Sequence, residues 1–263
     1  MPPRTTMSDW IEQLQSRGRY TFTRKDAESE TGRSFIATQT ALRRLKEKGK
    51  IVAPRRGFYV IVPPEYRATG APPASWFIDA LMRHLDQPYY VGVLSAATLH
   101  GASHQQPMIF QVVTSKPTRE VRVGKVTIRF STSRKVEPMP TTIMQTETGT
   151  MRVATSETAA FDLVRYPLAA GQLQNMATVL GEMAERIDGR ELVEVANLVK
   201  LPDVQRLGYL LEAVGARDLA APMADWLEIQ RPRVVPLLSG GPAQGEINQR
   251  WRIHINAELD LEA

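Results

Sequence analysis

The sequence predicts an α+β protein, in which an N-terminal winged helix-turn-helix precedes a mixed α/β body with C-terminal helices. Three observations predict this fold class. Residues 24–61 follow the order helix, turn, helix and tight hairpin. Residues 109–130 contain strand-like β-branched runs, and residues 168–227 carry apolar side chains at helical spacing.

Composition limits the classes of protein to consider. The chain has 263 residues, of which 43% are hydrophobic, so we expect about two domains at roughly 150 residues each. The absence of cysteine excludes disulfides, thiolate metal sites and a cysteine nucleophile, and it favours a reducing cytoplasm. We expect no secretion signal, and no membrane-spanning helix because no apolar run reaches about 18 residues.

The positive charge is concentrated at the N-terminus. Residues 1–69 hold 14 basic and 7 acidic residues, a net charge of +7, which leaves −2 for the remainder of a chain whose total is +5. A basic unit of this kind favours a polyanionic partner, because bound phosphates release counterions.

The N-terminal unit is assigned from its local signals. Ser8 is a suitable cap for a first helix whose apolar face is Trp10, Ile11 and Leu14. The remaining elements are then expected as a short strand at 20–22, a helix at 24–30, a turn at 31–33, a helix at 34–48 and a hairpin of 51–53 with 58–61.

The helix at 34–48 has the two faces that a DNA-recognition helix needs. Its expected apolar side, which packs on the other helices, consists of Phe35, Thr38, Ala41, Leu42 and Leu45. The opposite side is rich in guanidinium groups, and Arg43 and Arg44 are the strongest candidates for base or phosphate contacts. Ile36 lies on the flank, where it either touches a thymine methyl group or packs against Trp10.

The hairpin tip, Pro54-Arg55-Arg56-Gly57, places two arginines at a glycine turn, where we expect them to be exposed and to lie along the DNA backbone or the minor groove. The expected DNA-binding residues are therefore Arg33, Ser34, Gln39, Thr40, Arg43, Arg44, Lys48, Arg55 and Arg56. The competing interpretations are a solvated basic surface and a winged helix that binds protein.

Five of the eleven residues 63–73 are proline or glycine, which predicts a linker. The expected domains are 1–63 for DNA binding, 64–74 as linker and 75–263 as the C-terminal domain, either whole or divided into an α+β part at 75–166 and a mainly helical part at 167–263. Ser75 and Ser156 are expected to cap helices, Pro222 to mark a helix start, and residues 250–256 to form a half-buried strand.

The candidate catalytic groups do not form a convincing set, so we expect no enzyme, no cofactor and no metal. His100 and His104 have metal-ligand spacing, but Gly101 and Ser103 interrupt the helix. Ser95 and His100 lack a nucleophile elbow and an orienting acid. The carboxylates Glu157 and Asp162 suit the first turn of a capped helix, while Glu120, Lys125 and Glu137 are too scattered for a nuclease.

Residues 89–106 contain the string Leu-Ser-Ala-x-x-x-His-Gly at 94–101, and residues 153–163 read Val-Ala-Thr-Ser-Glu-Thr-Ala-Ala-Phe-Asp-Leu. With the winged helix, these strings resemble the AbiEi family of antitoxins from type IV toxin–antitoxin systems over roughly residues 8–165. The resemblance implies binding to repeats in the operon's own promoter, autorepression, and a C-terminal region that opposes a nucleotidyltransferase toxin. It implies no tight complex with that toxin and assigns no role to a C-terminal residue.

The sequence therefore predicts a DNA-binding antitoxin and autorepressor whose partners are double-stranded DNA and, functionally, a nucleotidyltransferase toxin. The alternatives are a protein-interaction module, a regulator without antitoxin activity, and an enzyme with a DNA-targeting head. The N-terminal unit alone is expected to bind DNA, with an affinity that falls steeply as salt rises.

Overall fold

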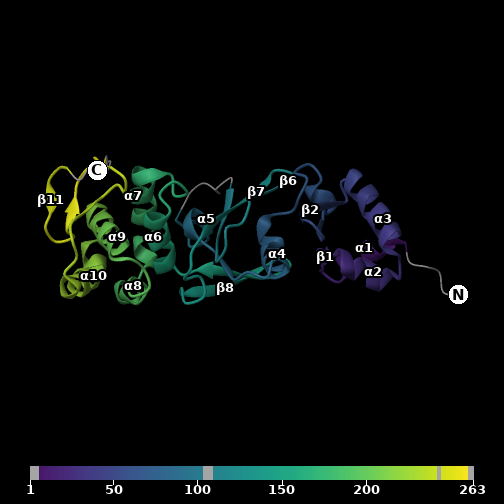
Figure 1. Cartoon of the computed structure of the whole chain (residues 1–263), viewed down its shortest axis with the longest axis horizontal. Coiled ribbons are helices and arrows are strands. Elements are labelled where there is room, and N and C mark those ends of the chain that lie inside the picture. The colour runs from purple at the N-terminus through teal and green to yellow at the C-terminus, as the bar shows by residue number, and fades with distance from the viewer. Residues whose placement is uncertain (1–5, 103–108, 242–243, 260–263) are drawn as a thin grey trace.

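The structure is a computed structural model that describes residues 6–102, 109–241 and 244–259. The molecule is elongated, as Figure 1 shows. A small N-terminal part, here called the head, lies at one end of the long axis, a β-sheet lies in the middle, and a group of helices lies at the other end. The α+β class predicted from the sequence is confirmed.

The head contains three helices and a three-stranded antiparallel sheet of order β1-β3-β2. Its elements are α1 (Met7–Ser16), β1 (Thr21–Thr23), α2 (Arg24–Thr31), α3 (Phe35–Glu47), β2 (Ile51–Arg55) and β3 (Phe58–Ile61). The predicted winged helix-turn-helix order is therefore present. Helix α1 begins at Met7, one residue before Ser8, which was the expected cap.

Aromatic residues lie at the centre of the head's core. The rings of Trp10 and Phe22 meet edge-on at 5.0 Å between centroids, and Phe22 stacks on Tyr59 at 5.4 Å. The Trp10 indole donates its hydrogen bond to Glu30 Oε2 at 3.0 Å, so its polar atom is satisfied at the edge of the core. Leu42 and Leu45 of α3 pack into the same cluster, which fixes the orientation of α3.

The body is built on a mixed six-stranded sheet of order β6-β7-β5-β4-β9-β8. Strands β4 and β9, and β5 and β7, pair in parallel, and the other neighbours are antiparallel. Its strands are β4 (Tyr89–Val91), β5 (Ile109–Thr114), β6 (Val121–Val123), β7 (Val126–Thr132), β8 (Thr141–Thr146) and β9 (Gly149–Ala154).

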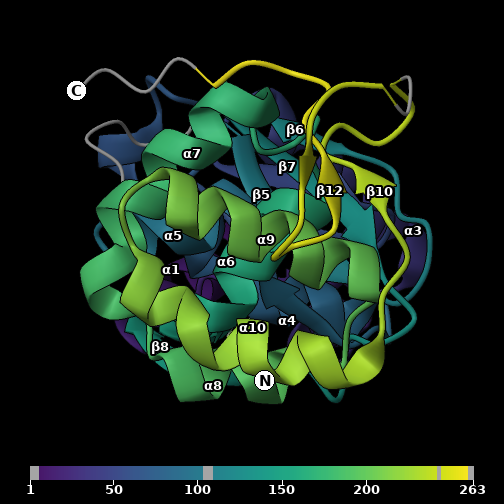
Figure 2. The same cartoon turned by 90° about the vertical axis from the view of Figure 1, so that its left-hand side faces the viewer.

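Helices cover the two sides of this sheet. In Figure 1, α4 (Ile78–His84) lies on the side toward the head, and α5 (Val93–Leu99) and α6 (Ser156–Arg165) lie on the side toward the C-terminal helices. The C-terminal helices lie in front in Figure 2 and are α7 (Gln172–Met183), α8 (Gly189–Ala196), α9 (Leu201–Ala213) and α10 (Arg217–Gln230). Beside them lies a small sheet whose strands, in order, are β10 (Val235–Pro236), β12 (Ile253–His254) and β11 (Ile247–Asn248). None of the described helices combines the length and apolar character that crossing a membrane requires.

The head and the body share a strand. Tyr59 and Ile61 of β3 pack on the head's core, whereas Phe58 and Val60, on the opposite face of the same strand, belong to the buried cluster that extends through the body to Ile253. Successive side chains of a strand point to opposite faces, so β3 is covered on both sides.

The segment between head and body, residues 64–74, is also packed. It includes the short 3₁₀ turn Pro64–Tyr66 and leads into another at Ala74–Trp76. The backbone N–H of Lys125 donates to the Thr69 carbonyl at 2.7 Å, and the backbones of Gly70 and Gly124 meet so closely that neither position has room for a Cβ. The β6–β7 turn thereby fastens this segment to the sheet.

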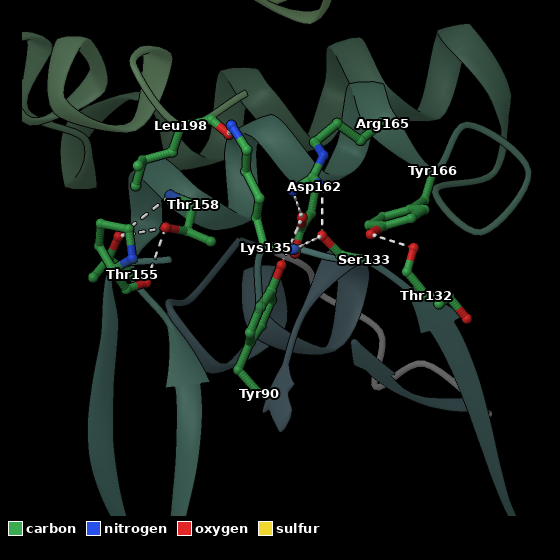
Figure 3. Close-up of polar contacts among 11 residues, drawn as sticks. Tyr90, Thr132, Ser133, Lys135, Thr155, Thr158, Asp162, Arg165, Tyr166 and Leu198 are labelled. Carbon is green, nitrogen blue, oxygen red and sulfur yellow. Dashed lines mark hydrogen bonds and ion pairs between the residues drawn. The ribbon is translucent and has the colours of Figure 1, made fainter. Parts of the chain in front are cut away.

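A polar network joins the sheet to α6, as Figure 3 shows. Asp162 is fully buried and accepts hydrogen bonds from the Tyr90 hydroxyl at 3.2 Å and from Arg165 at 3.3 Å. Arg165 also donates to Ser133 Oγ at 3.0 Å. Burial, opposed by the nearby Arg165, raises the pKa of Asp162 to about 7. The Tyr90 hydroxyl and Arg165 thus hydrogen-bond to the buried Oδ1 of Asp162, which lowers the cost of burying a polar group.

Several local predictions are wrong. Thr6, not Ser8, caps α1 in a capping box with Asp9, and Thr155, not Ser156, caps α6. Ser75 lies in the 3₁₀ turn before α4 and makes no cap. Pro222 lies inside α10 rather than at its start. The predicted strand at 250–256 is reduced to β12, although Trp251 and Ile253 are buried, and β8 was not predicted.

Candidate nucleic-acid interface

The turn between α2 and α3 is set by local signals. Thr23 caps α2 in a reciprocal capping box with Asp26. Gly32 ends that helix with φ of 62°, a left-handed conformation that glycine adopts without strain. Ser34 then caps α3 by accepting from the backbone N–H of Ala37 at 3.4 Å. These caps fix where α3 begins.

Helix α3 divides into a buried and an outward face. Thr38, Leu42 and Leu45 are buried, so the side of α3 at their angular positions faces the head's core. The residues at positions 36, 40 and 43 lie on the opposite side of the helix and position 39 lies at the edge of that side, because each residue advances the direction by about 100°. The face predicted to carry the DNA contacts is therefore accessible.

The predicted contact residues divide by their exposure. Ser34, Gln39, Arg43, Arg44, Lys48 and Arg56 are exposed, while Arg33, Thr40 and Arg55 are partly buried. Arg43 lies 3.8 Å from Glu47 in an exposed i,i+4 ion pair, which is weak enough for a phosphate to displace. Eight of the nine predicted residues lie on or beside α3 or at the tip of the hairpin, and their side chains form no hydrogen bond or ion pair with the described part of the body.

Arg55 is the exception, because its expected exposure at the hairpin tip is wrong. Its guanidinium group turns toward the body and donates to the carbonyl oxygens of Arg119 and Glu120. Burial and the nearby charge of Arg119 lower the pKa of Arg55 from its usual value. No local pattern predicts this contact, because the two carbonyl groups lie more than 60 residues away from Arg55 in the chain.

Two apolar residues of α3 also differ from the prediction. Phe35 was expected on the buried face, yet it is 48% exposed, and the Arg24 guanidinium lies over its ring at 4.6 Å from the centroid. Ile36 is 74% exposed, so the alternative in which it packs against Trp10 is wrong.

The hairpin tip docks on the body. Gly57 adopts φ of 79° at the turn. His84 of α4 donates from Nε2 to the Arg56 carbonyl at 3.2 Å, and its ring lies 5.3 Å from that of Phe58. The backbone of the tip is thus fixed, while the Arg56 side chain stays exposed.

A basic strip that the sequence analysis missed continues from the docked hairpin. Residues 116–129 contain five basic residues and one acidic residue, and the exposed members are Lys116, Arg119, Arg122, Lys125 and Arg129. The only acid, Glu120, pairs with Arg122 and Arg129. Averaging charge over the whole body concealed this strip, and a local charge count over residues 116–129 would have found it.

The candidate catalytic groups have structural partners. His100 Nε2 donates to the Ala154 carbonyl at 2.7 Å, and Ser95 Oγ accepts from the Gln111 backbone at 2.9 Å. Glu157 accepts from the Asp188 N–H at 3.0 Å. His104 lies outside the described residues, and within the described ranges no three His, Asp or Glu side chains form a cluster suited to a metal ion.

Comparisons with known proteins agree with this architecture. One family model, described as "AbiEi antitoxin C-terminal domain", matches residues 90–213, and a second, "Transcriptional regulator, AbiEi antitoxin", matches residues 11–62. A search of the curated proteins gives no match. The crystal structure of the RV2827C protein from Mycobacterium tuberculosis is similar, with a TM-score of 0.65 and 15% identity over 96% of this chain and 94% of that chain. At this identity the likeness concerns the fold alone.

Proposed function

The chain belongs to the AbiEi antitoxin family, and from this premise we propose that it is the DNA-binding antitoxin and transcriptional autorepressor of a type IV toxin–antitoxin operon. In this proposal the head binds repeats in the operon's own promoter, and the body opposes a nucleotidyltransferase toxin. The antagonism is functional and requires no direct complex between the two proteins.

The observation that carries the DNA-binding part is the outward face of α3. Gln39, Arg43 and Arg44 are exposed on a helix whose opposite face is locked into the head's core. Figure 1 shows α3 at the far end of the molecule, with β2 between it and the body. A duplex can therefore approach the face that carries donors for guanine, adenine and phosphate.

The docked hairpin and the basic strip extend this surface. Arg56 is exposed at the hairpin tip, and Lys116, Arg119 and Lys125 are exposed on the neighbouring part of the body. We assign them to phosphate contacts flanking the bases that α3 reads, because side chains of this kind position a duplex without reading its sequence. Arg55 is left out of the contact set, since the body already holds its guanidinium group.

A binding titration tests the DNA-binding part. The full chain is titrated onto its own upstream DNA and onto a scrambled duplex, at several salt concentrations. We expect preference for the upstream DNA and a log–log salt slope of about −0.9 for each phosphate contacted. Binding that is absent, or that ignores both salt and sequence, would contradict the proposal and favour a protein-interaction module.

A growth assay tests the antitoxin part separately. The neighbouring reading frame is expected to encode a nucleotidyltransferase whose expression arrests growth, and co-expression of this chain is expected to restore it. A reporter driven by the upstream DNA measures autorepression in the same cells. Repression without rescue would leave a transcriptional regulator that lacks antitoxin activity.

A further inference from the structure

Helix α3 presents a large apolar side chain to solvent. Of the large hydrophobic side chains that are exposed among the described residues, Phe35 and Ile36 are the only two adjacent in sequence, and both lie in the first turn of α3. Ile36 is 74% exposed. A single exposed isoleucine needs no explanation, so the argument depends on what surrounds this one.

Ile36 belongs to a stripe that includes polar readers. At helical spacing, Ile36, Thr40 and Arg43 occupy the face opposite the buried Thr38, Leu42 and Leu45, and Gln39 lies at the edge of that outward face. The stripe therefore presents, in order from the N-terminus, an apolar group, an amide, a hydroxyl and a guanidinium. The N-terminal residues of a recognition helix are those that reach base edges in the major groove.

The position of Ile36 is fixed by its neighbours. Ser34 caps the helix immediately before it. Phe35 is held to the side, because the Arg24 guanidinium lies over its ring at 4.6 Å. Phe35 thus packs along α2 at the margin of the helix, and Ile36 is left as the apolar group on the outward stripe.

Only one base edge in the major groove offers an apolar surface, the C5-methyl group of thymine. Amide and guanidinium side chains suit adenine and guanine. We propose that Ile36 packs against a thymine methyl group in the operator and thereby selects thymine at one position of each bound site. The basic side chains of Arg33, Arg43 and Arg44 around it match the charge of a duplex. This inference rests on the proposed DNA-binding function.

Removing the methyl group alone gives a direct test. Each thymine in the protected upstream segment is replaced in turn by deoxyuridine, which pairs identically but lacks the methyl group. For the full wild-type chain, one thymine per bound site is expected to weaken binding about fourfold on replacement, the effect of leaving roughly one CH₂-sized group unburied. The Ile36→Ala variant is expected to bind the thymine and deoxyuridine duplexes equally at that position.

Ile229 offers a matched control. It is 79% exposed on α10, at the opposite end of the molecule, and Ile229→Ala should keep the full sensitivity to the methyl group. Thermal unfolding should be unchanged in both variants, since both side chains lie in solvent. If wild-type protein binds the upstream DNA specifically but ignores every deoxyuridine, or if Ile36→Ala keeps the sensitivity, the inference is wrong while the proposed function stands. If no specific binding occurs, both are wrong.

Discussion

Asp162 is a residue on which burial and charge conflict. It is fully buried between the sheet and α6, with Tyr90 and Arg165 as its hydrogen-bond partners. Burial also disfavours the charged form of Arg165. The neighbouring Asp162 carboxylate favours that form, and the pKa of Arg165 is raised. Both hydrogen bonds are accepted by Oδ1 of Asp162, and removing Arg165 alone would leave the buried carboxyl group without its positively charged partner.

This conflict predicts a pH effect on stability. The pKa of Asp162 in the folded chain is raised from 3.8 to about 7, so the folded state holds the proton more tightly than the unfolded state. This group therefore lowers the free energy of unfolding as pH rises from about 4 to 7, by at most about 1.4 kcal/mol per pH unit. Asp162→Asn should lack this slope. Denaturant unfolding of both proteins at pH 5 and pH 7.5 measures it, and parallel changes would show that Asp162 has an ordinary pKa.

The two faces of α3 predict opposite phenotypes. Arg43→Ala or Arg44→Ala should cost roughly 1–3 kcal/mol of operator affinity, if the arginine makes a base contact, and leave unfolding unchanged. Leu42→Ala should instead cost about 2–5 kcal/mol of stability, because it leaves a cavity in the head's core. Arg217→Ala is the matched control for the arginines, since Arg217 is exposed at the far end of the molecule. Arginine variants that unfold the head without affecting binding would reverse the assignment of the faces.

At the scale of elements, the sequence predicts the helices and strands whose signals are local. The helices of the head, their order and the buried positions Leu42 and Leu45 follow from apolar spacing and turn residues. Strand β8 escaped prediction because it is an edge strand with little burial and no clear alternation. Phe35 was misplaced because helical spacing alone puts it on the apolar side, whereas in the first turn of α3 it is half exposed, with the Arg24 guanidinium over its ring.

The hairpin turn gives a prediction at this scale. Gly57 and Gly215 both adopt left-handed backbone conformations, with φ of 79° and 84°, and neither has an atom near the site of a Cβ. Valine at either position should therefore cost stability through backbone strain, on the order of 1–2 kcal/mol. Only Gly57→Val should also weaken operator binding, because it displaces the hairpin tip and Arg56. Equal affinities for the two variants would remove the tip from the interface.

At the scale of the whole molecule, the sequence could not predict how the head joins the body. The proline-rich segment 64–74 has the composition of a flexible linker, and only tertiary contacts fasten it to the β6–β7 turn. The same holds for Arg55, whose partners are distant in sequence. We propose that the head and the body form one structural unit and that the head is not an independent domain.

A truncation tests this proposal. In a fragment of residues 1–63, Phe58 and Val60 would lose the body that buries them, and each fully buried apolar side chain is worth about 1.5–3 kcal/mol. The fragment should therefore unfold at a lower denaturant concentration than the full chain. It should also bind upstream DNA more weakly than the full chain does. Circular dichroism during urea unfolding checks this, and a fragment that matches the full chain in both respects would argue for an independent head.

Strand β3 is covered on both faces, and this has a consequence for the degradation of the protein in a cell. Cleavage between the head and the body would leave an uncovered apolar surface on each fragment, so that the released head would be a weaker repressor than the full chain. Under the proposed function, turnover then ends repression and antagonism in one event, and the operon resumes transcription at the moment when its toxin is released from control.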